Sequence, residues 1–192
     1  MLKITAFNGS ARRDGNTAIL LNTALAELKA RGFETELVQL AGKPLRGCMA
    51  CNGCARNKDK KCVQPDDGLN GYIEKMEASA GILIGSPTYF ADVSSETKAL
   101  IDRSGYVSMA NGGLYKRKAG AAVVAVRRGG AIHAFDTINH FFTINQMIIP
   151  GSSYWNMGVG RGIGEVEADQ EGMGTMKVLG ENMAWLLSKL HG

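Results

Sequence analysis

Residues 2–17 place a hydrophobic strand pattern directly before a helical one, with a polar loop between them. The helical spacing of apolar residues begins at Thr17. The first N–H groups of a helix have no intrahelical acceptors, and the helix dipole puts about half a positive charge at that end, which suits a phosphate. Because the glycine spacings G-x-G-x-x-G and G-x-x-x-x-G-K-[ST] are absent, we expect a phosphate ester smaller than a dinucleotide or a nucleoside triphosphate.

The side chains of this loop support the same prediction. Ser10, Asn16 and Thr17 can each donate a hydrogen bond beside the backbone N–H groups, and Arg12 or Arg13 supplies positive charge. The alternative is an ordinary turn between a strand and a helix, in which Asn16 or Thr17 only caps the helix. The hydroxyl groups, the two arginines and the position after a strand favour the phosphate site.

The composition is that of a soluble globular protein. Of 192 residues, 45% are hydrophobic and 21% are charged. We expect one domain over residues 1–192, which at this length buries roughly 70% of its unfolded surface. The net charge of +4 is small and scattered, which argues against nucleic acid as a partner. No apolar run approaches the ~18 residues of a membrane span, and no signal-peptide pattern is present, so we expect a cytoplasmic protein with no membrane partner.

Strand-like and helical segments alternate along the chain. After the first strand, further strand patterns occupy residues 33–40, 80–85, 120–126 and 147–149. The alternation predicts an α/β fold, namely a doubly wound, five-stranded parallel sheet of flavodoxin-like order 2-1-3-4-5 with helices on both faces. The ligand is then expected at the carboxyl ends of the strands, beside the loops at 9–16, 41–67, 86–93, 127–130 and 151–164.

A second candidate loop, SPTYF, follows the strand pattern at 80–85. Pro87 stiffens its backbone, and Tyr89 and Phe90 offer flat apolar faces. Aromatic residues at a strand end are often only part of the core. Here they share an edge of the sheet with the phosphate site, which favours an aromatic ligand with a phosphate tail, and FMN fits that description.

Three stretches resemble the flavodoxin-like NADPH-dependent FMN reductase family: NGSARRDGNT, GSPTYF with the following DV, and GSSYWNMGVGR. The resemblance covers essentially the whole chain and implies FMN phosphate contacts from Ser10, Arg12, Asn16 and Thr17. It implies contacts with the isoalloxazine ring from Pro87, Thr88, Tyr89 and Phe90, and a third FMN loop at Arg127, Arg128, Gly129 and Gly130. Family members are commonly homodimers or homotetramers, so Trp155 could cover a flavin of its own or a neighbouring subunit; a buried core Trp is the alternative.

All four cysteines lie in the segment 41–67, which has no periodicity and is expected to be a loop insertion. The spacing of Cys48, Cys51, Cys54 and Cys62 is C-x2-C-x2-C-x7-C. Thiolates so spaced can bind an iron–sulfur cluster, and the spacing is similar to that of iron–sulfur flavoproteins, a branch of the same family with a [4Fe-4S] cluster beside FMN. Zinc and free thiols are the alternatives. Since strand two lies beyond strand one from the ring pocket, transfer from a cluster to the flavin is expected to run partly through a subunit contact.

Together these features predict an FMN-dependent oxidoreductase. It would take electrons from a reduced donor, NAD(P)H or ferredoxin, and could pass them through the cluster. FMN carries the chemistry, so no side chain is expected to act as a catalytic acid or base. One alternative is a one-electron carrier that partners ferredoxin without turning over a substrate. Another is a flavodoxin-like protein whose cysteines hold a structural zinc ion.

Overall fold

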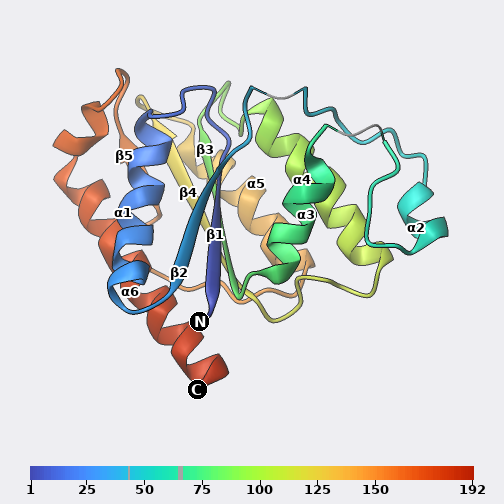
Figure 1. Cartoon of the computed structure of the whole chain (residues 1–192). Helices are drawn as coiled ribbons and strands as arrows, with labels where there is room; N and C mark the ends of the chain where they lie inside the picture. The colour runs from blue at the N-terminus through green and yellow to red at the C-terminus, as the bar shows by residue number, and fades with distance from the viewer. Residues whose placement is uncertain (43, 65–66) are drawn as a thin grey trace.

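The computed structural model describes residues 1–42, 44–64 and 67–192, and its centre is a five-stranded parallel sheet (Figure 1). The strands are β1 (Lys3–Asn8), β2 (Glu34–Gln39), β3 (Gly81–Pro87), β4 (Ala119–Val126) and β5 (Met157–Val159). Their order is β2-β1-β3-β4-β5, and each neighbouring pair is parallel. The flavodoxin-like α/β fold predicted from the sequence is confirmed.

Helices cover both faces of the sheet (Figure 1). One face carries α1 (Asn16–Ala30) and α6 (Gln170–His191), and the other carries α3 (Leu69–Ala78), α4 (Ser95–Ala110) and α5 (Ala131–Ile144). Successive strand residues point to opposite faces, so Leu83 packs with α1 and α6, whereas Ile82 and Ile84 pack with the other three helices. The short helices are α2 (Gly53–Asn57) and the 3₁₀ helix η1 (Glu165–Ala168). Within the described ranges, no helix has the length and apolar character needed to traverse a bilayer.

The prediction of the fifth strand at 147–149 is wrong. Ile148 makes only an isolated bridge to the start of β4, and the next residue but one, Pro150, has no N–H to donate to a sheet. β5 lies instead within the glycine-rich segment 151–164 and pairs with the end of β4. Position 158 requires glycine, because a Cβ there would lie 2.6 Å from Cγ2 of Val166 in η1. A segment expected to be only a loop therefore completes the sheet.

Two glycines set how closely the loop after β1 and helix α1 approach β3. A Cβ at Gly85, in β3, would lie 2.6 Å from Cδ1 of Leu21 and 2.9 Å from Cγ2 of Thr17. Gly9, which follows β1, donates its N–H to the Gly85 carbonyl at 2.8 Å. A Cβ at Gly9 would lie 1.8 Å from Oγ1 of Thr97. The loop between β1 and α1 therefore lies directly against β3 and the start of α4.

We expect Gly85→Ala to lower the free energy of unfolding by about 1–3 kcal/mol, because the added methyl group overpacks the contact with α1. Urea denaturation followed by circular dichroism measures the change. Gly71→Ala in α3 is the matched control, since a Cβ there would meet no atom within 4 Å and alanine is the better helix former by about 0.5–1 kcal/mol. Equal stabilities of the two variants would contradict the close contact between β3 and α1.

Candidate functional site

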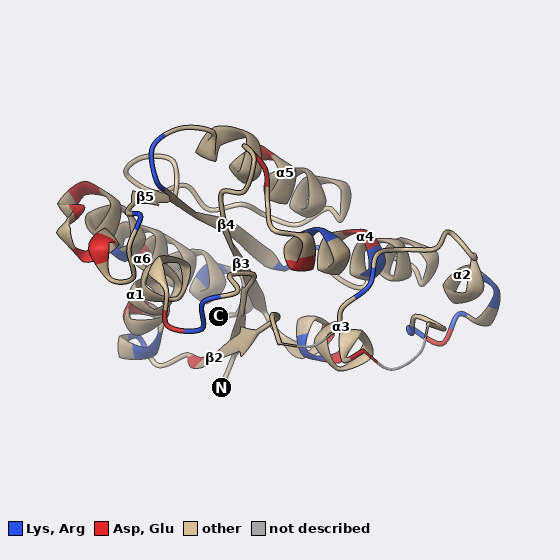
Figure 2. Cartoon of the chain, turned by 90° about the horizontal axis from the view of Figure 1, so that it is seen from above, with Lys and Arg blue, Asp and Glu red and all other residues tan. Residues whose placement is uncertain are grey.

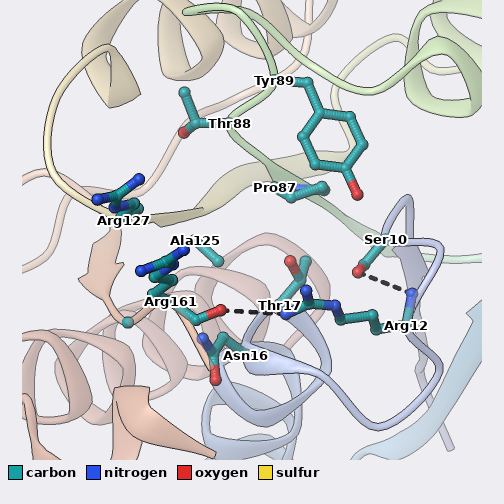
Figure 3. Close-up of a pocket in the computed structure, with 11 residues that line it drawn as sticks. Ser10, Arg12, Asn16, Thr17, Pro87, Thr88, Tyr89, Ala125, Arg127 and Arg161 are labelled. Carbon is teal, nitrogen blue, oxygen red and sulfur yellow. Dashed lines mark hydrogen bonds between the residues drawn. The ribbon is translucent and has the colours of Figure 1, made fainter. Parts of the chain in front are cut away.

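A cavity opens at the carboxyl ends of β1, β3 and β4, at the edge where the sequence predicted the ligand (Figure 3). Its volume is about 160 Å³; since pockets that bury a drug-sized ligand start at ~300 Å³, it would enclose only part of a nucleotide. The predicted FMN residues that line it are Ser10, Arg12, Asn16, Thr17, Pro87, Thr88, Tyr89 and Arg127. Three further residues line it that were not among the predicted ones, namely Ala125, Gly160 and Arg161.

Side chains from two strands hold the loop after β1. Asn8, the last residue of β1, accepts the Ser10 N–H through Oδ1 at 3.1 Å and donates from Nδ2 to Oε1 of Gln39 at 2.7 Å. Gln39, the last residue of β2, donates to the Ser10 carbonyl at 2.6 Å. The Ser10 hydroxyl accepts the Arg12 N–H at 3.1 Å, so its own O–H can still donate to a ligand. The backbone of Ser10 is therefore held on both sides by side chains of the protein.

The N-terminus of α1 faces the same cavity. Its N-cap is Gly15, with no side-chain cap among the described residues, so the alternative in which Asn16 or Thr17 caps the helix is wrong. Asn16 holds a loop over the cavity instead, because its Nδ2 donates to the Gly162 carbonyl at 2.9 Å and its Oδ1 accepts the Gly164 N–H at 3.0 Å. An uncapped helix start presents its first N–H groups, and its dipole favours an anion there.

Arginine side chains make the cavity positive. Arg12, Arg127 and Arg161 line it, and the Arg12 guanidinium donates to the Arg161 carbonyl at 3.0 Å. Figure 3 shows Arg127 and Arg161 on one side of the cavity and Tyr89 with Ser10 on the opposite side. Across the described ranges, none of these three arginines has a carboxylate within ion-pair distance. Glu165 offsets part of the charge of Arg161, since its carboxylate accepts the Arg161 N–H at 2.8 Å. The remaining positive charge attracts anionic ligands.

The loop after β3 contributes an unpaired polar atom. Thr88 donates its N–H to the Ala125 carbonyl at 2.8 Å, but its Oγ1 is buried without a hydrogen-bond partner in the part of the chain that the structure describes. Buried hydroxyl groups normally have partners, so this one suits a ligand. Tyr89 lines the cavity, whereas Phe90 does not and is fully exposed, with its backbone in the left-handed region at φ 48°.

The third predicted loop reaches the cavity through Arg127, while Arg128, Gly129 and Gly130 do not line it. Gly130 supports the neighbouring turn: its φ is 88°, and a Cβ there would lie 2.9 Å from Cα of Ala91. Both the left-handed backbone and the close contact explain why glycine occupies this position. Contacts of Phe90, Arg128, Gly129 and Gly130 with FMN stay predictions.

The cysteines belong to a separate region of the molecule. Figures 1 and 2 place α2, which carries Cys54, beyond α3 and α4 from the sheet. Cys48 and Cys51 are exposed, Cys62 is partly buried and Cys54 is buried. Burial raises the pKa of Cys54, backbone N–H groups lower it, and the nearby thiolates of Cys62 and Cys48 raise it further. These three sulfur atoms therefore share one neighbourhood.

Hydrogen-bond donors approach two of these sulfur atoms. The N–H of Ala50 donates to Sγ of Cys48 at 3.4 Å, and Nη2 of Arg103 donates to Sγ of Cys62 at 3.3 Å. Such donors stabilise the thiolate, which is the form that binds metals. In the described ranges, however, no group of three or more His, Cys, Asp or Glu side chains is arranged to hold a metal ion. The donor set fits a thiolate-bound centre in its chemistry, although the sulfur atoms are not gathered around one point.

Tyr154 and Trp155 are both about half exposed, with their rings in edge contact at a centroid distance of 4.6 Å. They line a shallow hollow with Phe135 and Pro150 and do not line the cavity described above. The interpretation of Trp155 as a buried core residue is therefore wrong. Its contact with a flavin, of this subunit or of another, stays a prediction.

Comparison with known proteins agrees with the fold. The sequence profile of the NADPH-dependent FMN reductase family matches residues 2–162. The chain is 36% identical over 190 residues to an iron–sulfur flavoprotein of Methanocaldococcus jannaschii, covering 95% of this chain and 96% of that protein. It is 34% identical over 154 residues to an iron–sulfur flavoprotein of Methanosarcina thermophila, covering 79% and 78%.

Among solved structures, RosB with bound 8-demethyl-8-formylriboflavin-5'-phosphate has the same fold, with a TM-score of 0.75 at 17% identity over 99% of this chain and 80% of that one. The sequence profile and the relatives of more than 30% identity go further than this likeness of fold. The chain belongs to the NADPH-dependent FMN reductase family and is an FMN-dependent oxidoreductase.

Proposed function

We propose that this chain binds FMN in the cavity and passes electrons from NAD(P)H through it to an acceptor. The strongest support is a single cavity that brings together an uncapped helix N-terminus and Oγ1 of Thr88. That oxygen has no hydrogen-bond partner among the described residues. The helix start suits the FMN phosphate, and the hydroxyl suits a polar atom of its ring. When bound, FMN supplies the hydride and one-electron chemistry.

Different lining residues would contact different parts of the cofactor. The first N–H groups of α1, with Ser10 and Arg12, would bind the phosphate through charge-assisted hydrogen bonds. Pro87 and Tyr89 offer apolar surface for the ring. Arg127 lies across the cavity from Tyr89 (Figure 3), where its positive charge would suit an anionic group of the electron donor. The chain's part in the reaction is thus to bind and orient.

The charge of the cavity favours a polyanionic donor. Once the FMN phosphate occupies the start of α1, the Arg127 guanidinium remains on the far side of the cavity, without a carboxylate partner in the described ranges. The phosphate groups of NAD(P)H suit guanidinium groups, which bind phosphate oxygens in pairs. This is why NAD(P)H is proposed ahead of ferredoxin as the donor.

The second candidate function is a one-electron carrier that partners an acidic protein such as ferredoxin. It is favoured by exposed basic side chains on the cysteine segment, of which Arg56 and Lys58 have no carboxylate partner among the described residues. Complementary charge of this kind speeds the encounter of two proteins. The two functions differ in turnover, since a carrier would oxidise NAD(P)H at a negligible rate.

We also propose that Cys48, Cys51, Cys54 and Cys62 bind an iron–sulfur cluster, which would supply one-electron chemistry. The spacing of the four thiols, the donors to the sulfur atoms of Cys48 and Cys62, and the names of the two relatives support this. Backbone in the left-handed region at Ala50, Asn52, Lys58 and Lys60 marks the segment as strained. In the part of the chain that the structure describes, no three of the cysteine side chains are arranged around one point.

An assembly of two or four copies, which the family resemblance implies, is part of the same proposal. Exposed apolar side chains of Tyr106, Met109 and Ile144 lie along a groove between α4 and α5. Burial of apolar surface is the main favourable term in protein association, so such side chains suit a contact between subunits.

We expect Asn8→Ala to weaken FMN binding about tenfold, because the Ser10 N–H loses its acceptor and the loop is no longer held in place. Fluorescence titration of the apoprotein with FMN measures the dissociation constant. Asn22→Ala, on the exposed surface of α1, is the matched control and should bind FMN as the parent chain does. If the two variants bind equally well, the loop does not depend on Asn8.

Arg127→Met should raise the KM for NADPH about tenfold and leave kcat nearly unchanged, provided that FMN is saturating. The physical reason is that an anion-binding group acts equally on bound substrate and transition state. Steady-state oxidation of NADPH and of NADH with ferricyanide as acceptor measures the effect. Arg31→Met, which removes a guanidinium paired with Glu27 and Glu181, is the control. A holoprotein that oxidises neither nucleotide would show that NAD(P)H is not the donor.

Protein purified without oxygen should contain about four iron and four sulfide per FMN, with an EPR signal after reduction. Cys51→Ser, at an exposed position, should lose the iron and keep FMN, because the cysteine segment and the cavity are separate. Metal and acid-labile sulfide analysis measures both. Zinc without sulfide would identify a structural zinc site instead. The absence of both zinc and iron would identify free thiols.

A further inference from the structure

Arg103 of α4 is a buried cation outside the FMN cavity. Its side chain is 1% exposed, and a guanidinium keeps its charge in proteins. Its Nη1 donates to the Arg46 carbonyl at 2.9 Å and to the Asp67 carboxylate, and its Nη2 donates to Sγ of Cys62 at 3.3 Å. A buried charge is costly unless it is paired and hydrogen-bonded. These three contacts offset that cost at Nη1 and Nη2, whereas Nε is buried without a partner among the described residues.

The same contacts tie together the two ends of the cysteine segment. Asp67 accepts the Arg46 N–H through Oδ2 at 3.2 Å and the Leu69 N–H through Oδ1 at 3.3 Å. Burial alone would raise the pKa of Asp67, but the hydrogen bonds from Arg103, Arg46 and Leu69 hold it below its ordinary value. Arg103 and Asp67 therefore form a charged pair that joins residue 46, before the first cysteine, to residues after the last one.

A second set of hydrogen bonds holds the backbone of Cys62. Its N–H donates to Oδ1 of Asn70 at 2.8 Å, and its carbonyl accepts from Nδ2 of Asn70 at 3.0 Å. Helix α3 thus holds the backbone of Cys62 while helix α4 holds its sulfur. Arg56, the arginine within the segment, is exposed and donates to the Cys51 carbonyl at 2.8 Å. Among the described residues, Arg103 is the charged side chain that donates to a cysteine sulfur.

We propose that Arg103 is a positioning residue for Cys62, which fixes its sulfur and, through the N–H···S hydrogen bond, stabilises the reduced state of a cluster bound there. The second part rests on the cluster proposed above. Reduction adds negative charge to the cluster and its thiolate ligands, and a cationic donor to a ligand sulfur offsets part of that charge. The hydrogen bond should therefore make the cluster easier to reduce.

Removal of Arg103 alone would leave Asp67 buried and unpaired. The test therefore compares variants in which Asp67 is replaced by the neutral residue Asn. Asp67→Asn keeps Arg103 and its hydrogen bond to Cys62, whereas Asp67→Asn with Arg103→Met lacks both. Arg56→Met controls for the loss of one positive charge from the segment. Arg103→Lys is the fallback if the double variant fails to bind FMN, since it keeps a cation and loses the forked donor. Each protein is used with FMN bound.

EPR-monitored redox titration should give a lower midpoint potential for the double variant, or for Arg103→Lys, than for Asp67→Asn and Arg56→Met. An equal or higher potential would overturn the effect on the reduced state. Hydrogen exchange in the FMN-bound, metal-free protein tests the positioning role of Arg103 without any cluster. Amides at 58–64 should exchange faster when Arg103 is replaced. Unchanged exchange would overturn the positioning role. A parent chain without iron would refute the proposed cluster, and with it the effect on its reduction, while the exchange data still decide the positioning.

Discussion

The cavity depends on one constraint, namely that the backbone of Gly9 and Ser10 is held from all sides. Gly9 donates to the Gly85 carbonyl at 2.8 Å, and its own carbonyl accepts from the Ser94 hydroxyl, the N-cap of α4, at 2.7 Å. Asn8 and Gln39 hold Ser10 in the same way. Because hydrogen bonds from the protein itself fix this loop, little conformational entropy would be lost when a phosphate binds. The adjoining start of α1 is aligned by the same contacts.

The cysteine segment is held by different contacts, namely side chains of two helices. Its ends are held by side chains of two helices, Arg103 on α4 and Asn70 on α3, while Cys48 and Cys51 are exposed. The FMN cavity lies at the strand ends, and α2 lies beyond the helix layer (Figure 2). The two regions share the fold but not their supporting contacts. A change in one is therefore expected to leave the other largely intact, which is what makes the cofactor experiments separable.

The order of the sheet and its ligand edge could be predicted because they follow from the alternation of strands and helices along the chain. The loops after β1 and β3 could be placed for the same reason. The position of β5 could not, because Gly158 lowers its strand propensity and the pairing with β4 decides where the strand forms. Arg161 was not singled out within the predicted ligand-facing loop 151–164, because its contact with the site spans 149 residues of sequence. That contact is the hydrogen bond from the Arg12 guanidinium to the Arg161 carbonyl.

The sequence by itself determined the fold class, the strand that leads into an anion-binding helix start, and the spacing of the four cysteines, since each is a property of neighbouring residues. Only the tertiary structure decided which polar groups are already paired. It assigned the Asn16 amide to a loop instead of a helix cap, left Thr88 Oγ1 without a partner in the described chain, and brought Arg103 to the sulfur of Cys62. The reason is physical: hydrogen bonding and desolvation depend on what surrounds a side chain in space, and residues distant in sequence supply most of those surroundings.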